Sequence, residues 1–169
     1  MAASLFASVV FLNIQDFARR SATEQARLRA QLQAVVAVTS DHGEEFGEQR
    51  CFDTPISELA LAGAAYGSAI TGLRPVFEIM FGDFMALPMD SLVNQSAKFW
   101  YVSNEQASVP LVVRSAVGAG GRFGAMHSQI HGTWFQGIPG LKIAGASNPA
   151  DAKGLLKAAI RDDNPVVFI

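Results

Sequence analysis

Apolar residues along this chain gather in short continuous runs separated by polar, glycine-containing connections. Four runs are rich in β-branched residues and predict strands: 74–80 (RPVFEIM), 110–117 (PLVVRSAV), 141–147 (LKIAGAS) and 165–169 (PVVFI). The runs are mostly apolar and show no regular alternation of apolar and polar residues. This pattern indicates strands that are buried on both faces of a sheet.

Helical patterns fill the segments between the predicted strands. Helix formers are frequent in 21–38, where Leu28, Leu32 and Val35 or Val36 follow helical spacing. A second helix is predicted over about 84–101, although Pro88 is unfavourable inside it, and a third helical stretch is predicted around 128–136.

The strongest helical signal lies in 147–163 (SNPADAKGLLKAAIRDD). Asn148 can cap this helix, Pro149 suits its first position, and Asp151 favours the positive end of the helix dipole. Strands that alternate with helices predict an α/β fold, with a parallel sheet flanked by helices. The chain stops within the last predicted strand, so we expect the natural sequence to continue.

Composition narrows the class of protein. The 169 residues are 50% hydrophobic and 17% charged, with a formal net charge of −2, which predicts one globular domain. The slight acidity argues against a nucleic-acid partner. The single cysteine, Cys51, excludes an internal disulfide framework and favours a cytoplasmic location.

The apolar N-terminus, MAASLFASVVFLNI, resembles neither a signal peptide nor a membrane helix. No basic residue precedes it, and it is shorter than the roughly 20 apolar residues that span a bilayer. We therefore expect residues 1–14 to form a short buried strand or helix, and the protein to be independent of membranes.

A glycine-rich loop, 118–124 (GAGGRFG), follows the second predicted strand. Its spacing is not G-x-G-x-x-G, so it predicts a tight turn close to a ligand or a neighbouring chain instead of a dinucleotide site. His127 follows directly, at the sheet edge where α/β proteins place their sites, and can be structural or catalytic. His42 and His131 have no comparable setting. No serine-hydrolase or zinc spacing is present.

The stretch DTPISE, 53–58, precedes the small-residue run LALAGAAYGSA and predicts a helix start. Glu58 then has two interpretations. As a first-turn residue it would stabilise the helix dipole. In an apolar pocket among Leu59, Ala60 and Leu61, it would stay protonated and exchange a proton with a ring nitrogen. The residues alone leave both interpretations of Glu58 open. Asp53 is interpreted as a loop or capping residue.

Seven segments together resemble one known family. It is the beta subunit of the thiamin-diphosphate-dependent decarboxylase of 2-oxo acid dehydrogenase complexes, which act on pyruvate, branched-chain 2-oxo acids or acetoin. The matching segments are FDTPISE, GLRPVFEIMFGDF, MDSLVNQSAK, VPLVVR, HSQ, PGLKI and DAKGLLKAAIRDDNPVVF.

The resemblance implies a transketolase-like pyrimidine-binding domain and roles for three residues. Glu58 matches the glutamate that hydrogen-bonds the aminopyrimidine of thiamin diphosphate and promotes deprotonation of the thiazolium carbon. Phe84 matches the aromatic residue packed against the pyrimidine. His127 matches the active-site histidine implicated in handling the decarboxylated intermediate and passing it to lipoamide.

The family also implies partners and ions. An alpha subunit would hold the diphosphate and magnesium within a heterotetramer, and a lipoyl-bearing acyltransferase would accept the acyl group. A potassium site is expected near Leu111, Ala159, Asp162 and Asn164. The enzyme would oxidatively decarboxylate a 2-oxo acid such as pyruvate, and the chain by itself is expected to be inactive.

The chain also departs from the family pattern. Residues 1–45 form a divergent segment before the pyrimidine domain at 46–169, and Met126 stands where glutamine is common. The family pattern continues past residue 169 into a C-terminal domain, which we expect this chain to lack. Two alternatives therefore remain: a truncated paralogue that acts only in assembly or binding, and a transketolase-type pyrimidine domain. A truncated chain would expose the surface that its family uses as an interface, so we also expect self-association.

Overall fold

The computed structural model of the chain describes residues 36–37, 51–52 and 54–169, with side chains from residue 54 onward. Within this part, six parallel strands form one sheet in the order β2-β1-β3-β4-β6-β5. The predicted α/β class and the four predicted strands are confirmed, as β3 to β6. The strands are β1 (Val36–Ala37), β2 (Cys51–Phe52), β3 (Val76–Phe81), β4 (Val112–Ala116), β5 (Lys142–Ala144) and β6 (Val166–Phe168).

Strands β1 and β2 were not predicted. Val36 and Ala37 were assigned to the end of a helix over 21–38, but they pair in parallel with Val76 and Phe77 of β3. A two-residue strand has no room to show a period of two, so the pattern could not reveal it. The remainder of that helix, the N-terminal apolar stretch, His42 and Asp53 lie outside the described residues.

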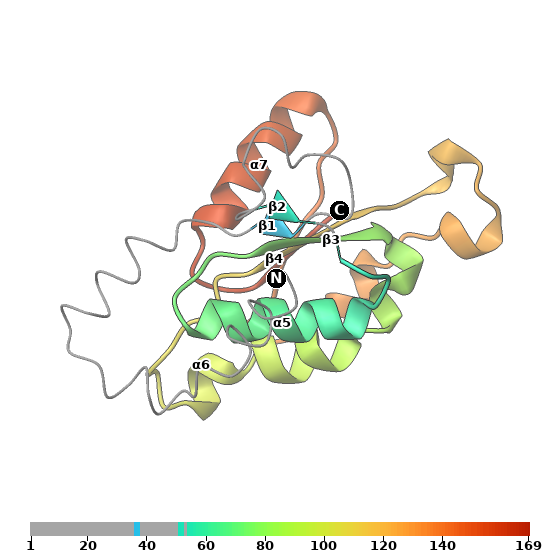
Figure 1. The fold of residues 1–169 in the computed structure, drawn as a ribbon. Coiled ribbons are helices and arrows are strands. Elements are labelled where there is room, and N and C mark those ends of the chain that lie inside the picture. The colour runs from blue at the N-terminus through green and yellow to red at the C-terminus, as the bar shows by residue number, and fades with distance from the viewer. Residues whose placement is uncertain (1–35, 38–50, 53) are drawn as a thin grey trace.

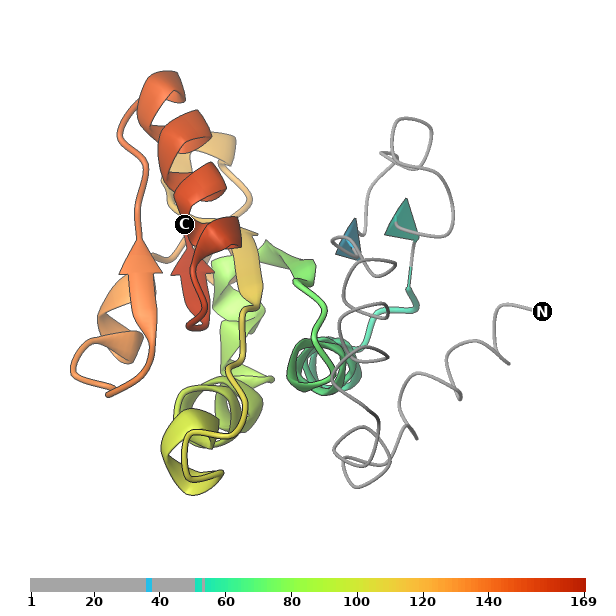
Figure 2. The same cartoon turned by 90° about the vertical axis from the view of Figure 1, so that its left-hand side faces the viewer.

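Helices cover both faces of the sheet. Figure 1 shows α5 (Glu58–Ile70) and α6 (Phe99–Val102) on one side, and α7 (Pro149–Arg161) on the other. Figure 2 shows the same layers with α5 seen along its axis. The predicted helix start at Glu58 is confirmed. In α7, Asn148 Oδ1 accepts a hydrogen bond from the backbone N–H of Asp151 at 2.9 Å, as the capping pattern predicted.

Neighbouring residues of one strand belong to different cores, which explains the continuous apolar runs. Phe77 and Val113 face the core under α5, whereas Val76 and Val112 face the core under α7. Phe77, Val113 and Val112 are at most 1% exposed. Strands buried on both faces have no polar side to display.

The segment predicted as one helix over 84–101 is broken into three parts: the 3₁₀ helix η1 (Gly82–Ala86), the π-helix η2 (Ser91–Ser96) and α6. Pro88 has no N–H to continue an α-helical ladder. Leu87 N instead bonds Phe84 O at 3.0 Å, and Ala97 N bonds Leu92 O, five residues back, at 3.0 Å. The single-helix prediction is therefore wrong.

The stretch around 128–136 is also not one helix. It follows two 3₁₀ turns, η3 (Ala119–Gly121) and η4 (Ala125–His127), and contains only the short 3₁₀ helix η5 (Gly132–Phe135). Gly124, with φ +83°, and Gly137, with φ +77°, adopt conformations that an α-helix excludes. Within the described residues, no helix is long and apolar enough to cross a bilayer.

Candidate active site

The carboxyl ends of the parallel strands meet at one edge of the sheet. β3 ends at Phe81 and continues directly into η1, while β4 ends at Ala116 and continues into the glycine-rich loop. Figure 1 shows the N-terminal end of α5 on this same side. Such an edge is where open α/β sheets bind ligands.

An aromatic cluster lies at this edge, built by the ends of β3 and β4. The ring of His127 lies 4.7 Å from that of Phe81 and 5.2 Å from that of Phe84, and both pairs meet edge to face. Phe123 joins the cluster, 5.4 Å from Phe81. Two of the three predicted site residues, Phe84 and His127, are therefore in contact across 43 positions of sequence.

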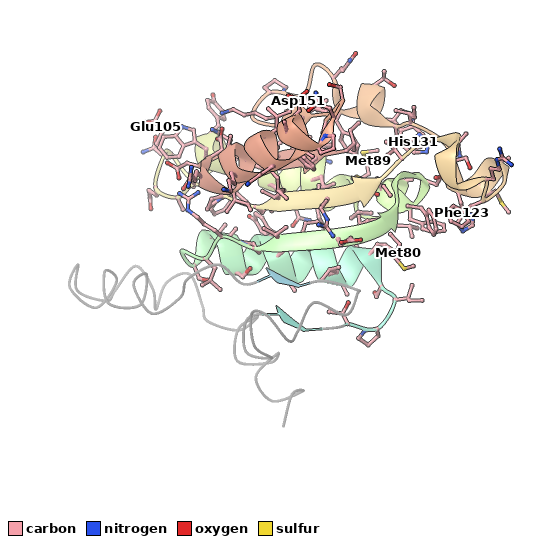
Figure 3. The ribbon with its side chains drawn as sticks, turned by 90° about the horizontal axis from the view of Figure 1, so that it is seen from above. Met80, Met89, Glu105, Phe123, His131 and Asp151 are labelled. Atoms are coloured by element: carbon pink, nitrogen blue, oxygen red, sulfur yellow. The ribbon has the colours of Figure 1, made fainter. Side chains whose placement is uncertain are left out.

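Residues 118–129 form a loop that we call the arm, which carries His127. Gly118 begins it with φ +91° and Gly124 continues it with φ +83°, conformations in which glycine is favoured. The arm closes on itself, because Gly118 N donates to Gln129 O at 3.2 Å. Phe123 lies toward its outer end, and His131 lies nearer the sheet (Figure 3).

Glu58 is the first residue of α5 and is half-buried. Its neighbours do not form an apolar pocket within the described residues: Leu61 is buried, but Leu59 is 57% exposed and Ile56 87% exposed. The described contacts do not join Glu58 to Phe84 or His127. Glu58 therefore begins α5 on the side of the sheet where the cluster lies, on a separate element.

A buried polar group beside the cluster was missed from the sequence. Asp83 Oδ1 accepts a hydrogen bond from Gln129 Nε2 at 2.7 Å and lies 3.8 Å from His131 Nε2. The side chains of Asp83 and His131 are each 6% exposed. His131 also stacks on Trp134 at 3.9 Å. The available signal was the position of Asp83, two residues after the end of a strand.

The charge of Asp83 is stabilised in this setting. Burial pushes the pKa of its carboxyl upward, but the hydrogen bond from Gln129, backbone hydrogen bonds and the nearby imidazole of His131 bring the pKa below its ordinary value. Asp83 Oδ2 and His131 Nε2 are buried and make no hydrogen bond within the described part of the chain. Such groups are uncommon in folded proteins.

The residues predicted to bind potassium lie around the end of α7 and the starts of β4 and β6. Asp162 Oδ1 accepts hydrogen bonds from Asn164 N and Nδ2, both at 2.9 Å, and Asp162 Oδ2 pairs with Lys142. Leu111 O accepts from Val166 N at 2.9 Å, and Ala159 O accepts from Asp162 N at 3.2 Å. The potassium site stays a prediction.

Comparison with known proteins identifies the class. The sequence profile of the transketolase pyrimidine-binding domain matches residues 11–169. The chain belongs to this family, and the predicted fold is thereby confirmed.

Within the family, the chain groups with beta subunits of 2-oxo acid and acetoin dehydrogenases, as its motifs predicted. It is 52% identical over 134 residues to the acetoin:2,6-dichlorophenolindophenol oxidoreductase subunit beta of Bacillus subtilis. It is 46% identical over 140 residues to the pyruvate dehydrogenase E1 component subunit beta of Rhizobium meliloti. It is 45% identical over 134 residues to the 2-oxoisovalerate dehydrogenase subunit beta of B. subtilis.

The matches cover most of this chain but a smaller part of each relative. They include 79%, 83% and 79% of the chain, against 39%, 30% and 41% of the three relatives. The profile match also reaches into residues 1–45, the segment predicted to be divergent, and the boundary at residue 45 stays a prediction.

A solved structure supports the fold independently. A split-gene transketolase, described as an inactive beta4 tetramer, superposes with a TM-score of 0.62 at 19% identity. The match covers 83% of this chain and 45% of that one. At this identity the likeness concerns the fold.

The residues at the sheet edge fit the aminopyrimidine part of thiamin diphosphate. Phe84 offers an aromatic surface for a flat ring, and Glu58 offers a half-buried carboxylate for a ring nitrogen. Several large apolar side chains around them are exposed, including Met126 at 74% and Phe123 at 61%. Apolar surface of this extent is typical of a site that a ligand or partner covers.

Proposed function

We propose that this chain supplies the pyrimidine-binding half of a thiamin-diphosphate-dependent 2-oxo acid or acetoin dehydrogenase and acts beside an alpha subunit. The contact between Phe84 and His127, two motif residues brought together at the carboxyl edge of the sheet, is the observation that carries the proposal. The 52% identity to an acetoin oxidoreductase subunit beta supports the same class.

Each of three residues has a distinct role in this proposal. Glu58, at the start of α5, accepts a proton from a pyrimidine ring nitrogen and returns it. Phe84 orients the ring. His127 donates or holds a proton beside the reacting group, from an apolar edge formed by Phe81 and Phe84. Thiamin diphosphate, when bound, supplies the nucleophilic carbon and the electron sink for decarboxylation.

The site needs a second chain. Within the described residues, the sheet edge offers apolar and aromatic surface, and its basic residue Arg122 is exposed on the arm. We propose that an alpha subunit holds the diphosphate and magnesium, that a lipoyl-bearing acyltransferase receives the acyl group, and that potassium binds near Asp162. We expect the assembly in the cytoplasm.

The test is reconstitution with alpha subunits of the three related classes. The chain, one alpha subunit, thiamin diphosphate and magnesium are mixed, and 2,6-dichlorophenolindophenol reduction is followed with acetoin, pyruvate or 2-oxoisovalerate. We expect reduction with one substrate class only, abolished by His127→Ala. A complex that assembles and binds the cofactor but reduces no dye would refute the catalytic role and favour the alternative of assembly or binding alone.

A further inference from the structure

A cluster that consists of the buried side chains of Asp83 and His131 and the exposed side chain of Gln129 has no role among the residues assigned so far. It joins the two segments that carry the site. Asp83 belongs to η1 and immediately precedes Phe84, while Gln129 belongs to the arm two positions after His127. The 2.7 Å hydrogen bond from Gln129 Nε2 to Asp83 Oδ1 therefore connects the Phe84 segment to the His127 segment.

Gln129 makes two connections at once. Its backbone oxygen accepts from Gly118 N at 3.2 Å and closes the base of the arm, while its side chain reaches Asp83. The tip of the arm is exposed from Ala119 to Met126. Among the described residues, the arm is held to the sheet edge by ring contacts with Phe81 and Phe84 and by the polar link through Gln129.

Burying a carboxylate here is costly. The Asp83 side chain is 6% exposed, Asp83 Oδ2 has no hydrogen-bond donor among the described residues, and His131 Nε2 at 3.8 Å is beyond hydrogen-bond length. Apolar residues of similar size usually join two loops at lower cost. The Asp83 carboxylate, however, accepts a hydrogen bond from one particular side chain, that of Gln129. Such a bond fixes the relative position of the two loops more specifically than apolar packing does.

We propose that Asp83 is a positioning residue: through Gln129 it holds the arm so that His127 packs against Phe81 and Phe84. The catalytic consequence rests on the function proposed for His127, but the positioning itself does not. A misplacement of about 1 Å in a reacting group can lower a rate about 10²-fold, so the link is expected to affect turnover more than cofactor binding.

The test uses the ring-current displacement of the His127 imidazole protons, measured by NMR on the full chain with labelled histidine. His42→Gln and His131→Gln assign the signals of the three histidines. We expect Asp83→Leu and Gln129→Leu to remove the displacement, and the double variant to remove no more than either single one. Asp83→Asn should retain it, because its amide oxygen still accepts from Gln129.

Asp90 provides a matched control. It is an exposed aspartate that also accepts from two side-chain amides, Asn94 at 2.7 Å and Gln95 at 2.9 Å. Asp90→Leu should leave the His127 signals unchanged. An unchanged His127 displacement in folded Gln129→Leu would overturn the proposal, and so would an equal loss in Asp83→Asn and Asp83→Leu. Gln129 is exposed, so its variant is expected to fold even where Asp83→Leu does not.

Activity with an alpha subunit separates this proposal from the function itself. If His127→Ala retains full activity while the NMR displacement responds to Gln129→Leu, the catalytic role of His127 fails and the positioning stands. If both His127→Ala and Gln129→Leu lower kcat, with Gln129→Leu causing a loss of up to about 10²-fold at unchanged cofactor affinity, both proposals are supported.

Discussion

Two carboxylates at one sheet edge differ in what their surroundings allow. Glu58 is half-buried at the first turn of α5, with exposed neighbours, so its carboxylate is accessible to an incoming ring. The Asp83 side chain is nearly fully buried and already accepts from Gln129. Accessibility therefore favours Glu58 for proton exchange with a ligand and Asp83 for holding structure.

Replacing Glu58 tests its proposed role. Glu58→Gln keeps the size of the side chain but removes the group that exchanges a proton, so we expect turnover in the reconstituted complex to fall by about 10²-fold or more. Glu105→Gln is the matched control, because Glu105 is exposed and lies at the opposite end of the molecule from Phe123 (Figure 3). Equal activities of the two variants would contradict the assignment.

The Asp162 carboxyl predicts an acid-sensitive contribution to stability. Burial raises its pKa, but hydrogen bonds from Lys142 and Asn164 outweigh this and lower the pKa from 3.8 to about 2. As the pH falls, the unfolded chain binds the proton first, so the stabilisation is complete above pH 3.8 and is lost toward pH 2.

Asp162→Asn checks this prediction. Urea unfolding between pH 5 and pH 2 should show a smaller loss of stability on acidification in the variant than in the unmodified chain. Glu105→Gln, which removes an exposed carboxylate elsewhere, should follow the unmodified chain. If acidification lowered the free energy of unfolding equally in Asp162→Asn and in the unmodified chain, the Asp162 carboxyl would not be a source of acid-sensitive stability.

At the scale of elements, α7 depends on its cap. Asn148 Oδ1 accepts from Asp151 N at 2.9 Å, and this bond satisfies one of the first N–H groups of the helix. Asn148→Ala should lower the free energy of unfolding by about 1 kcal/mol, measured by urea denaturation. Lys153→Ala, an exposed change inside the same helix, should have little effect. Similar losses in both variants would exclude the cap as the cause.

The loop before β5 depends on Gly140. Its φ is +85°, and a Cβ atom built there would lie 1.8 Å from the carbonyl oxygen of Ala97. Gly140→Ala must therefore move the loop away from the end of η2, in addition to an intrinsic cost of about 1–2 kcal/mol for the left-handed conformation. Gly154→Ala in α7 meets no atom and is the control. The midpoint of urea unfolding should therefore be clearly lower for Gly140→Ala than for Gly154→Ala.

At the scale of the whole molecule, several strongly exposed apolar side chains lie around the proposed site, and others lie on α6. Ile56 precedes α5, Met126 belongs to the arm, and Ile130 directly follows the arm. We expect the chain alone to self-associate as its concentration rises, seen by sedimentation velocity. Met126→Lys should weaken the association, whereas Leu155→Lys on α7 should not. A monomer at all concentrations would contradict this prediction.

The sequence alone determined the fold class, the strands β3 to β6, the start of α5 and the cap of α7. These features depend on residues close together in the chain: continuous apolar runs for buried strands, and Asn148 with Asp151 for a helix end. Motif resemblance then singled out Glu58, Phe84 and His127. The π-helix after Pro88 and the two-residue strands β1 and β2 gave no periodic signal.

The tertiary structure decided which residues act together. In the sequence, the place of Asp83 two residues after a strand is the only local signal for this pair, and His131 has none. Their burial follows from the parallel pairing of β3 with β4, which brings η1 against the base of the arm. The contact between Phe84 and His127 has the same origin. Local patterns report the environment of single elements, whereas a site assembled at a sheet edge depends on strand order, which is set by packing across the whole domain.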